Sequence, residues 1–243
     1  MQILILGASS QVGLALTRAF ASGNTLWLVG RNRARLDEAV QVGIAAGAIR
    51  CTALEVDLVT LGTLDAGIAG AGPIDLIVDA ASASSAFRDS EIPAASFSGL
   101  VLADAASRGP LMAALLSHQP NAPAIIFIST VLARLRSPDR LVYSALKQLM
   151  ESYYRRLSAE RPDLRLMVVT VGTVIDPKRP SEKPVRLAAA VRQAYDEGRS
   201  SLFFGGIGKL YLCLFYLQPL VFFAVTRLQR SLRRVPRKGT GKG

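Results

Sequence analysis

Short apolar runs alternate with longer amphipathic stretches along most of the chain. The apolar runs predict strands at residues 3–6, 25–29, 49–56, 74–79, 124–129, 166–171 and 201–204. The amphipathic stretches predict helices at about 11–22, 33–46, 60–70, 97–117, 141–160 and 183–197. Strands that are apolar throughout are typical of a parallel sheet covered on both faces. The pattern therefore predicts an α/β fold: a Rossmann-type, doubly wound parallel sheet of about seven strands with right-handed crossovers.

The alternation continues to about residue 205 without an internal repeat or a Pro/Ser-rich linker. A chain of 243 residues is within the range of one α/β sheet domain. We therefore expect one catalytic domain over residues 1–205 and an appended segment over 206–243.

A glycine-containing turn connects the first predicted strand to the first predicted helix. Its residues are Gly7, Ala8, Ser9, Ser10, Gln11, Val12 and Gly13. Gly7 permits a tight turn, and Gly13 lets the helix pack closely. The small Ser9 and Ser10 leave room for a ligand, and the amides of a helix N-terminus favour a pyrophosphate. A plain strand-to-helix turn is the alternative, but the position after the first strand of an alternating chain favours a nucleotide.

The end of the second predicted strand indicates which nucleotide binds. A carboxylate there would bind the adenosine ribose and favour NAD. This chain has Gly30-Arg31-Asn32-Arg33 instead. Arg31 can pair with a 2′-phosphate and stack on adenine, so the sequence favours NADP(H) over the alternative of an ordinary solvated arginine.

Tyr143 and Lys147 are four residues apart on the predicted helix at 141–160, so they share one helix face. A phenol has a pKa near 10, and an ammonium one turn away stabilises the phenolate and brings that pKa closer to the working range. Ser129 and Thr130 end the fifth predicted strand, at the sheet edge where ligands bind. A hydroxyl there can hold a substrate carbonyl.

Together with the turn at 7–13, these residues resemble the short-chain dehydrogenase/reductase family over about residues 1–205. The resemblance implies that Tyr143 is the acid/base and that Lys147 lowers its pKa and binds the nicotinamide ribose. The serine that polarises the carbonyl in the family falls on Thr130, 13 residues before Tyr143, with Ser129 beside it. Which of the two hydroxyls takes the role is left open.

Other positions match the family in altered form. Asp79-Ala80-Ala81-Ser82 replaces the usual Asn-Asn-Ala-Gly, and Val171-Gly172 replaces Pro-Gly. The family's catalytic asparagine is missing between 98 and 117, where Asp104 is the nearest polar candidate. The resemblance implies further cofactor contacts from Asp57, Leu58, Ala80, Ala81, Gly172 and Thr173.

Residues 210–225 carry no charge, and a basic cluster follows. As a helix this run would be about 24 Å long, short of the ~30 Å hydrocarbon core, and Pro219 would kink it. A core or dimer helix and a true span are the alternatives, but an apolar helix flanked by cations favours insertion at an anionic membrane surface. We expect a peripheral or monotopic protein on the cytoplasmic face.

Composition excludes several function classes. Seven of the cations lie within residues 227–243 and account for most of the net charge of +11, so the basic character belongs to the tail. No aromatic residue or nucleic-acid-binding motif accompanies these charges, which argues against nucleic acid as a partner. His118 is the only histidine, and the two cysteines lack metal-ligand spacing, so no metal site or Ser-His-Asp triad is expected. The cysteine usage and the lack of a secretory signal fit a reducing compartment.

These features predict an NADPH-dependent oxidoreductase. It would reduce a ketone, or oxidise the matching alcohol, on a lipid or lipid-linked sugar at the membrane surface. The layout looks like that of decaprenylphosphoryl-2-keto-erythro-pentose reductases and of 3-ketosphinganine reductases. The alternative is a non-catalytic NADP(H)-binding scaffold or sensor subunit of a membrane enzyme complex. By resemblance, a homo-oligomer paired through the helices at 97–117 and 141–160 is expected.

Overall fold

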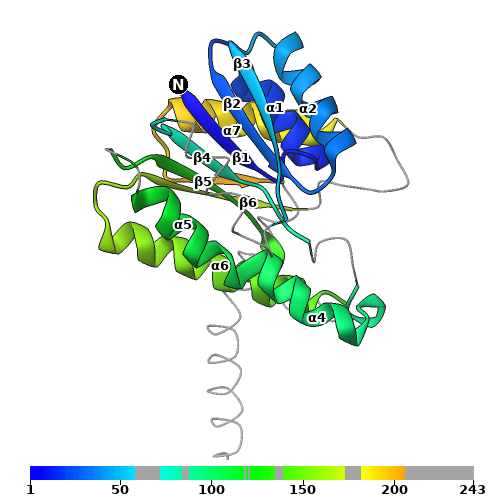
Figure 1. The fold of residues 1–243 in the computed structure, drawn as a ribbon. Helices are drawn as coiled ribbons and strands as arrows, with labels where there is room; N and C mark the ends of the chain where they lie inside the picture. Colours follow the sequence, from blue (N-terminus) through cyan, green and yellow to red (C-terminus); the bar gives the residue numbers. More distant parts are fainter. Residues whose placement is uncertain are drawn as a thin grey trace, which may run out of the picture.

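A computed structural model describes residues 1–57, 72–83, 88–117, 119, 121–134, 139–172 and 182–205. These residues form a parallel sheet with helices on both faces (Figure 1). The predicted helix at 60–70 and the segment 206–243, with its predicted membrane helix, lie outside the described residues.

The sheet has seven strands in the order β3-β2-β1-β4-β5-β6-β7, and every neighbouring pair is parallel. The strands are β1 (Gln2–Leu6), β2 (Thr25–Gly30), β3 (Arg50–Glu55), β4 (Leu76–Asp79), β5 (Ala124–Thr130), β6 (Leu166–Val171) and β7 (Ser201–Phe204). The chain runs outward from β1 to β3 and then crosses to β4 on the other side of β1. This confirms the predicted doubly wound sheet and puts its topological switch point between β1 and β4.

Helices cover both faces of the sheet (Figure 1). One face carries α1 (Gln11–Ala21), α2 (Arg33–Ala45) and α7 (Lys183–Asp196), and the other carries α4 (Ala94–Val101), α5 (Arg108–Ser117) and α6 (Leu141–Glu160). Strand β1 shows why helices must cover both faces of the sheet, since it carries apolar side chains on each face. Ile3 and Ile5 pack into the core under the first layer, whereas Leu4 and Leu6 pack into the core under the second, because successive strand side chains point to opposite faces.

The predicted continuous helix at 97–117 is wrong in one respect. The helical segment begins at Ala94, and a π-helical turn, η3 (Leu102–Ala106), separates α4 from α5. Asp104 lies in this turn and is buried, with its carboxylate accepting hydrogen bonds from Ser82 Oγ at 3.1 Å and from the Ala83 amide at 2.5 Å. A π-helical turn re-aims the side chains that it carries and is frequent at functional sites.

A short 3-10 helix, η2 (Asp89–Glu91), holds the start of α6 in place. The Asp89 carboxylate accepts hydrogen bonds from the backbone amides of Leu141 at 2.6 Å and Val142 at 3.2 Å. These amides belong to the first turn of the helix and have no acceptor within it. Asp89 thus caps the N-terminus of α6, which begins two residues before Tyr143.

Candidate active site

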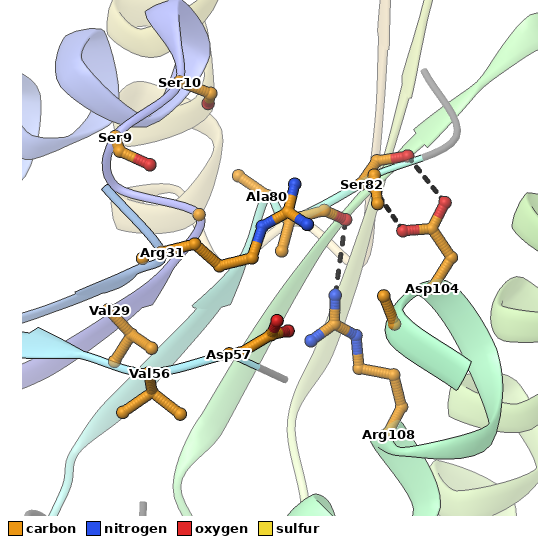
Figure 2. A pocket seen from close by; sticks show the side chains of 15 residues that line it. Ser9, Ser10, Val29, Arg31, Val56, Asp57, Ala80, Ser82, Asp104 and Arg108 are labelled. Atoms are coloured by element: carbon orange, nitrogen blue, oxygen red, sulfur yellow. Dashed lines mark hydrogen bonds between the residues drawn. The ribbon is translucent and has the colours of Figure 1, made fainter. Parts of the chain in front are cut away.

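A pocket opens at the carboxyl ends of β1, β2 and β4, at the switch point of the sheet (Figure 2). It is lined by Gly7, Ser9, Ser10, Val29, Gly30, Arg31, Val56, Asp57, Ala80, Ala81, Ser82, Ala83, Ala103, Asp104 and Arg108. Seven of the predicted cofactor residues are therefore brought together here, from four separate segments of the chain. They are Gly7, Ser9, Ser10, Arg31, Asp57, Ala80 and Ala81.

The turn after β1 has the shape of a phosphate cradle. Gly7 has a φ of +81°, and a Cβ added to it would lie 2.7 Å from Ala81 Cα. A Cβ on Gly13 would lie 2.1 Å from the Gly7 carbonyl oxygen, so the helix packs directly under the turn. Ser10 caps α1, with its Oγ accepting a hydrogen bond from the Gly13 amide at 2.9 Å. The only residue type that fits at either glycine position is glycine, and the helix N-terminus behind the turn favours an anion.

Charged side chains surround the outer part of the pocket. Figure 2 shows Arg31, Asp57 and Arg108 entering it from three different elements. Arg31, directly after β2, is exposed, and its guanidinium extends over the opening. An arginine beside a phosphate-binding turn suits a nucleotide that carries an additional phosphate on its ribose.

The remaining predicted cofactor residues are placed differently. Gln11 and Val12 follow the turn on α1 but do not line the pocket. Gly172 lies just beyond β6, where its amide donates to the Phe204 carbonyl oxygen at 2.9 Å. Leu58 and Thr173 lie outside the described residues.

Lys147 is buried at the centre of the second predicted group. Its Nζ donates to the carbonyl oxygens of Ile128 at 3.0 Å and Ala81 at 3.4 Å, and it lies 5.1 Å from the centroid of the Phe127 ring. Burial lowers the pKa of Lys147 below its ordinary value, an effect that Asp79 and Asp104 oppose. The lysine thus connects β5 to the segment after β4. This segment lines the pocket described above.

Tyr143 lies one helical turn before Lys147 and is half-buried. Burial raises the pKa of Tyr143, and a hydrogen bond with the Thr130 side chain acts in the opposite direction. The Asp104 charge adds to the rise, and the Arg140 charge reduces it. The structure therefore brings the Thr130 hydroxyl and the Tyr143 phenol together at the end of β5.

Ser129 faces another partner. Its Oγ donates to Glu151 Oε2 at 2.9 Å, and both side chains are buried. Arg134 and Arg155 also pair with Glu151, at 2.5 and 2.9 Å. Burial acts to raise the pKa of Glu151, but the hydrogen bonds from Arg134, Ser129 and Arg155 outweigh it and hold that pKa below its ordinary value. The two neighbouring hydroxyls thus meet different residues of α6: Ser129 is bonded to Glu151, and Thr130 lies beside Tyr143, about two turns earlier on the helix.

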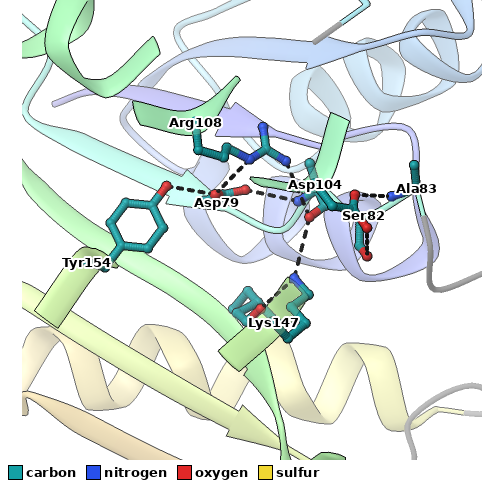
Figure 3. A network of polar contacts seen from close by, with 9 residues as sticks. Asp79, Ser82, Ala83, Asp104, Arg108, Lys147 and Tyr154 are labelled. Atoms are coloured by element: carbon teal, nitrogen blue, oxygen red, sulfur yellow. Dashed lines mark hydrogen bonds and ion pairs between the residues drawn. The ribbon is translucent and has the colours of Figure 1, made fainter. Parts of the chain in front are cut away.

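Arg108 and Tyr154 belong to the same polar network, and sequence reasoning missed both (Figure 3). Arg108 Nε lies 3.4 Å from Asp79 Oδ2, and the Tyr154 hydroxyl donates to the same oxygen at 2.7 Å. Burial and the Asp79 charge raise the pKa of Tyr154 well above its ordinary value. The signal in the sequence was the lone arginine four residues after Asp104 in an otherwise apolar helix.

Fold and site together define a nucleotide-binding α/β protein of the Rossmann type. A family profile described as short chain dehydrogenase matches residues 1–177. The chain therefore belongs to the short-chain dehydrogenase/reductase family and is an oxidoreductase, as the residues around Tyr143 and Lys147 predicted.

Solved structures with the same fold share little sequence with this chain. A short-chain dehydrogenase from Streptomyces avermitilis has a TM-score of 0.76 at 22% identity, covering 97% of this chain and 98% of that one. A short-chain dehydrogenase from Sphingobium yanoikuyae, in complex with NADPH, has a TM-score of 0.72 at 20% identity, covering 99% and 98%. A bulky-bulky ketone specific alcohol dehydrogenase from Comamonas testosteroni has a TM-score of 0.75 at 18% identity, covering 99% and 96%. No curated protein matches the sequence significantly.

Two further properties of the described residues concern metal binding and membrane insertion. Across the described ranges, no group of three or more His, Cys, Asp or Glu side chains could hold a metal ion. One helical stretch, Ala95–Ser117, is long and apolar enough to cross a membrane. Half of its most apolar 18-residue window is buried within the protein, and α5 packs into the core against the sheet, which is the behaviour of a core helix.

Proposed function

We propose that the chain is an NADPH-dependent reductase of a ketone, with Tyr143 as the proton donor and Thr130 as the group that holds the carbonyl oxygen. The observation that carries this proposal is the placement of the buried Lys147. Its Nζ donates to the Ile128 carbonyl near the end of β5 and to the Ala81 carbonyl beside the nucleotide pocket, and Tyr143 lies one turn before it on α6. Thr130, Tyr143 and Lys147 lie beyond the carboxyl edge of the sheet, where ligands of doubly wound folds bind.

The pocket fits NADP(H). Gly7, Ser9 and Ser10 provide the surface for the pyrophosphate, Arg31 pairs with the 2′-phosphate, and Asp57 binds the adenine end. The bound cofactor supplies the hydride that reduces the carbonyl carbon. The NADPH-bound relative from Sphingobium yanoikuyae supports this choice of cofactor.

Tyr143 protonates the oxygen of the substrate. Burial raises the pKa of Tyr143, so the phenol keeps its proton at neutral pH and has one to donate. Lys147 carries a positive charge one turn away, which stabilises the phenolate that remains after the transfer. Thr130 donates its hydroxyl to the same oxygen and thereby stabilises the negative charge that develops there.

Ser129 has no part in this chemistry. Its hydroxyl is committed to Glu151, about two turns further along α6 than Tyr143. Breaking that bond would remove one of the hydrogen bonds to a buried carboxylate, which is unfavourable. Thr130 therefore takes the role of the serine found at this position in the family.

For the substrate, we propose a ketone on a lipid or lipid-linked sugar, met at the cytoplasmic surface of a membrane. The support is the sequence of 206–243, an uncharged run followed by a basic cluster, which suits an anionic surface. Within the family, this layout resembles decaprenylphosphoryl-2-keto-erythro-pentose and 3-ketosphinganine reductases. A homo-oligomer paired through α4, α5 and α6 remains a prediction, supported by exposed Phe97, Leu102 and Leu149 on this side of the molecule.

The experiment is NADPH oxidation by the detergent-solubilised protein, with and without a lipid extract of its host's membranes. Tyr143→Phe is the matched variant. We expect lipid-dependent oxidation that Tyr143→Phe abolishes while NADPH binding persists. Full turnover by Tyr143→Phe would refute the proton-donor role. NADPH binding without any turnover would instead favour a non-catalytic binding subunit.

A further inference from the structure

A buried ion pair lies directly beneath the segment that joins the nucleotide pocket to Lys147 (Figure 3). Asp79 ends β4 and Arg108 begins α5, and each side chain is only 1% exposed. Arg108 Nε lies 3.4 Å from Asp79 Oδ2, and the Tyr154 hydroxyl donates to the same oxygen at 2.7 Å. Removing two charges from water is costly, so such a pair is weak evidence for stability and calls for another explanation.

The pair and Lys147 meet at one residue, Ala81. The Ala81 amide donates to Asp79 Oδ1 at 3.2 Å. Its carbonyl oxygen accepts contacts from Lys147 Nζ at 3.4 Å and from Arg108 Nη2 at 3.5 Å. Ala81 also packs against Gly7, where an added Cβ would lie 2.7 Å from Ala81 Cα. Ala81 therefore links the phosphate turn, the ion pair and the lysine.

Lys147 needs a counter-charge that it does not contact. Among the described residues, no carboxylate lies within 4.0 Å of Lys147 Nζ, whose hydrogen bonds go to carbonyl oxygens. Four buried charged groups share this region: Lys147 and Arg108 are positive, and Asp79 and Asp104 are negative. Their charges balance, and a buried ammonium remains charged only where nearby negative charge offsets its desolvation.

We propose that Asp79 and Arg108 are positioning residues for Lys147: Asp79 provides the distant counter-charge that keeps the lysine protonated, and Arg108 holds both Asp79 and the Ala81 carbonyl in place. The charged groups that act on Lys147 are Asp79 from β4, Asp104 from η3 and Arg108 from α5. The Phe127 ring and the carbonyls of Ile128 and Ala81 contact it directly, and Tyr143 lies one turn before it on α6. The electrostatic effects have the directions that this role requires: Asp79 and Asp104 raise the pKa of Lys147, whereas Arg108 lowers it. The catalytic importance of a charged Lys147 rests on the proposed function.

The test is the titration of Lys147 itself, observed by NMR in protein labelled with carbon-13 at the lysine ε-position. The chain has only six lysines, so the spectrum is simple, and Lys147→Arg assigns the signal. This measurement needs no substrate, and so a failure of the proposed function leaves it intact. In the unmodified protein we expect an ammonium signal at pH 7, despite burial. A neutral amine at pH 7 would overturn the proposal.

Variants separate charge from packing. Asp79→Asn should move the Lys147 titration to lower pH, because Arg108 then repels the lysine without an opposing carboxylate. Adding Arg108→Met to Asp79→Asn should move it back up and raise the melting temperature above that of the single variant. Tyr154→Phe is the matched control: it removes a hydrogen bond to Asp79 but no charge, and should leave the titration in place. An unchanged titration in Asp79→Asn, or a shift in Tyr154→Phe equal to that in Asp79→Asn, would refute the counter-charge role.

The same variants have a consequence for turnover. If the proposed function holds, kcat/KM of Asp79→Asn should decline at lower pH than in the unmodified enzyme, on the alkaline side of the profile, and adding Arg108→Met should restore part of the loss. Turnover that is absent in the unmodified enzyme would contradict the proposed function, whereas a normal alkaline limb in Asp79→Asn would contradict only the role of the ion pair.

Discussion

Replacing Thr130 by valine tests the assignment of the carbonyl-binding group. Valine keeps the shape of threonine at the end of β5 but lacks the hydroxyl that bonds to Tyr143. Loss of one donor to a developing oxyanion raises the activation free energy by about 2.7–4 kcal/mol, which lowers kcat by a factor of about 10²–10³. A second loss is structural, since Thr130 Oγ1 also accepts a hydrogen bond from the Leu132 amide at 3.3 Å, and this costs about 1 kcal/mol of stability.

Two companion variants make the comparison specific. Thr130→Ser keeps a hydroxyl and should retain most of the activity. Ser129→Ala removes a hydrogen bond to Glu151, which still pairs with Arg134 and Arg155, so it should cost about 1.5–3 kcal/mol of stability with kcat largely unchanged. The assay is steady-state NADPH oxidation at saturating ketone, with NADPH affinity measured by fluorescence titration and stability by urea unfolding.

We expect NADPH affinity to be the same in all three variants, because none of the altered side chains lines the nucleotide pocket. A fall in kcat restricted to Thr130→Val would establish the role. If Ser129→Ala were inactive and Thr130→Val fully active, the reasoning from side-chain direction would be refuted. If kcat in the three variants fell in proportion to their loss of stability, this would also count against a catalytic role of Thr130.

Three further predictions concern the nucleotide pocket and acid stability. Arg31→Ala should weaken NADPH binding by about tenfold without affecting NADH, as expected for a lost charged hydrogen bond. Arg33→Ala, which removes an exposed ion pair nearby, is the calorimetric control. Gly7→Ala should abolish NADPH binding and lower the melting temperature, since φ is +81° and the added Cβ would lie 2.7 Å from the backbone after β4. Gly23→Ala, also at positive φ but with open space around it, should retain binding. The pKa of Glu151 is lower in the folded protein than the ordinary value of about 4.3. The ionised carboxylate therefore stabilises the fold at pH values above about 4.3, and this contribution is lost as the pH falls through the lower pKa of the folded state. Melting curves from pH 6 to pH 3 should therefore fall more steeply for the unmodified protein than for Glu151→Gln, and parallel curves would contradict this.

Local patterns determined most of the architecture. A strand buried on both faces needs a continuous apolar run, and a covering helix needs one apolar face, so the sequence alone predicted the elements and the order in which they occur. Gly7 and Gly13 were also predictable, because a tight turn beneath a helix excludes larger side chains. Tyr143 and Lys147 were predictable for a similar reason, since their four-residue spacing on a helix already places them on one face.

Only the tertiary structure decided which polar groups meet. Ser129 and Thr130 are equivalent as residues in the sequence, but the way α6 packs beside the end of β5 sets Ser129 against Glu151 and Thr130 against Tyr143. The π-helical turn around Asp104 has no local signature in the sequence, since its hydrogen bonds to Ser82 and Ala83 depend on how the helix packs beside the end of β4.

The ion pair between Asp79 and Arg108 shows the same limit most clearly. The two residues are 29 positions apart. A lone arginine in an apolar helix indicates that a counter-charge is needed, but the sequence does not say which carboxylate provides it. They pair because α5 lies against the sheet beside β4, and each charge is tolerated in the core only because the other is there. Periodicity and spacing determine which elements form, whereas the packing of those elements determines which buried charges and hydroxyls act together.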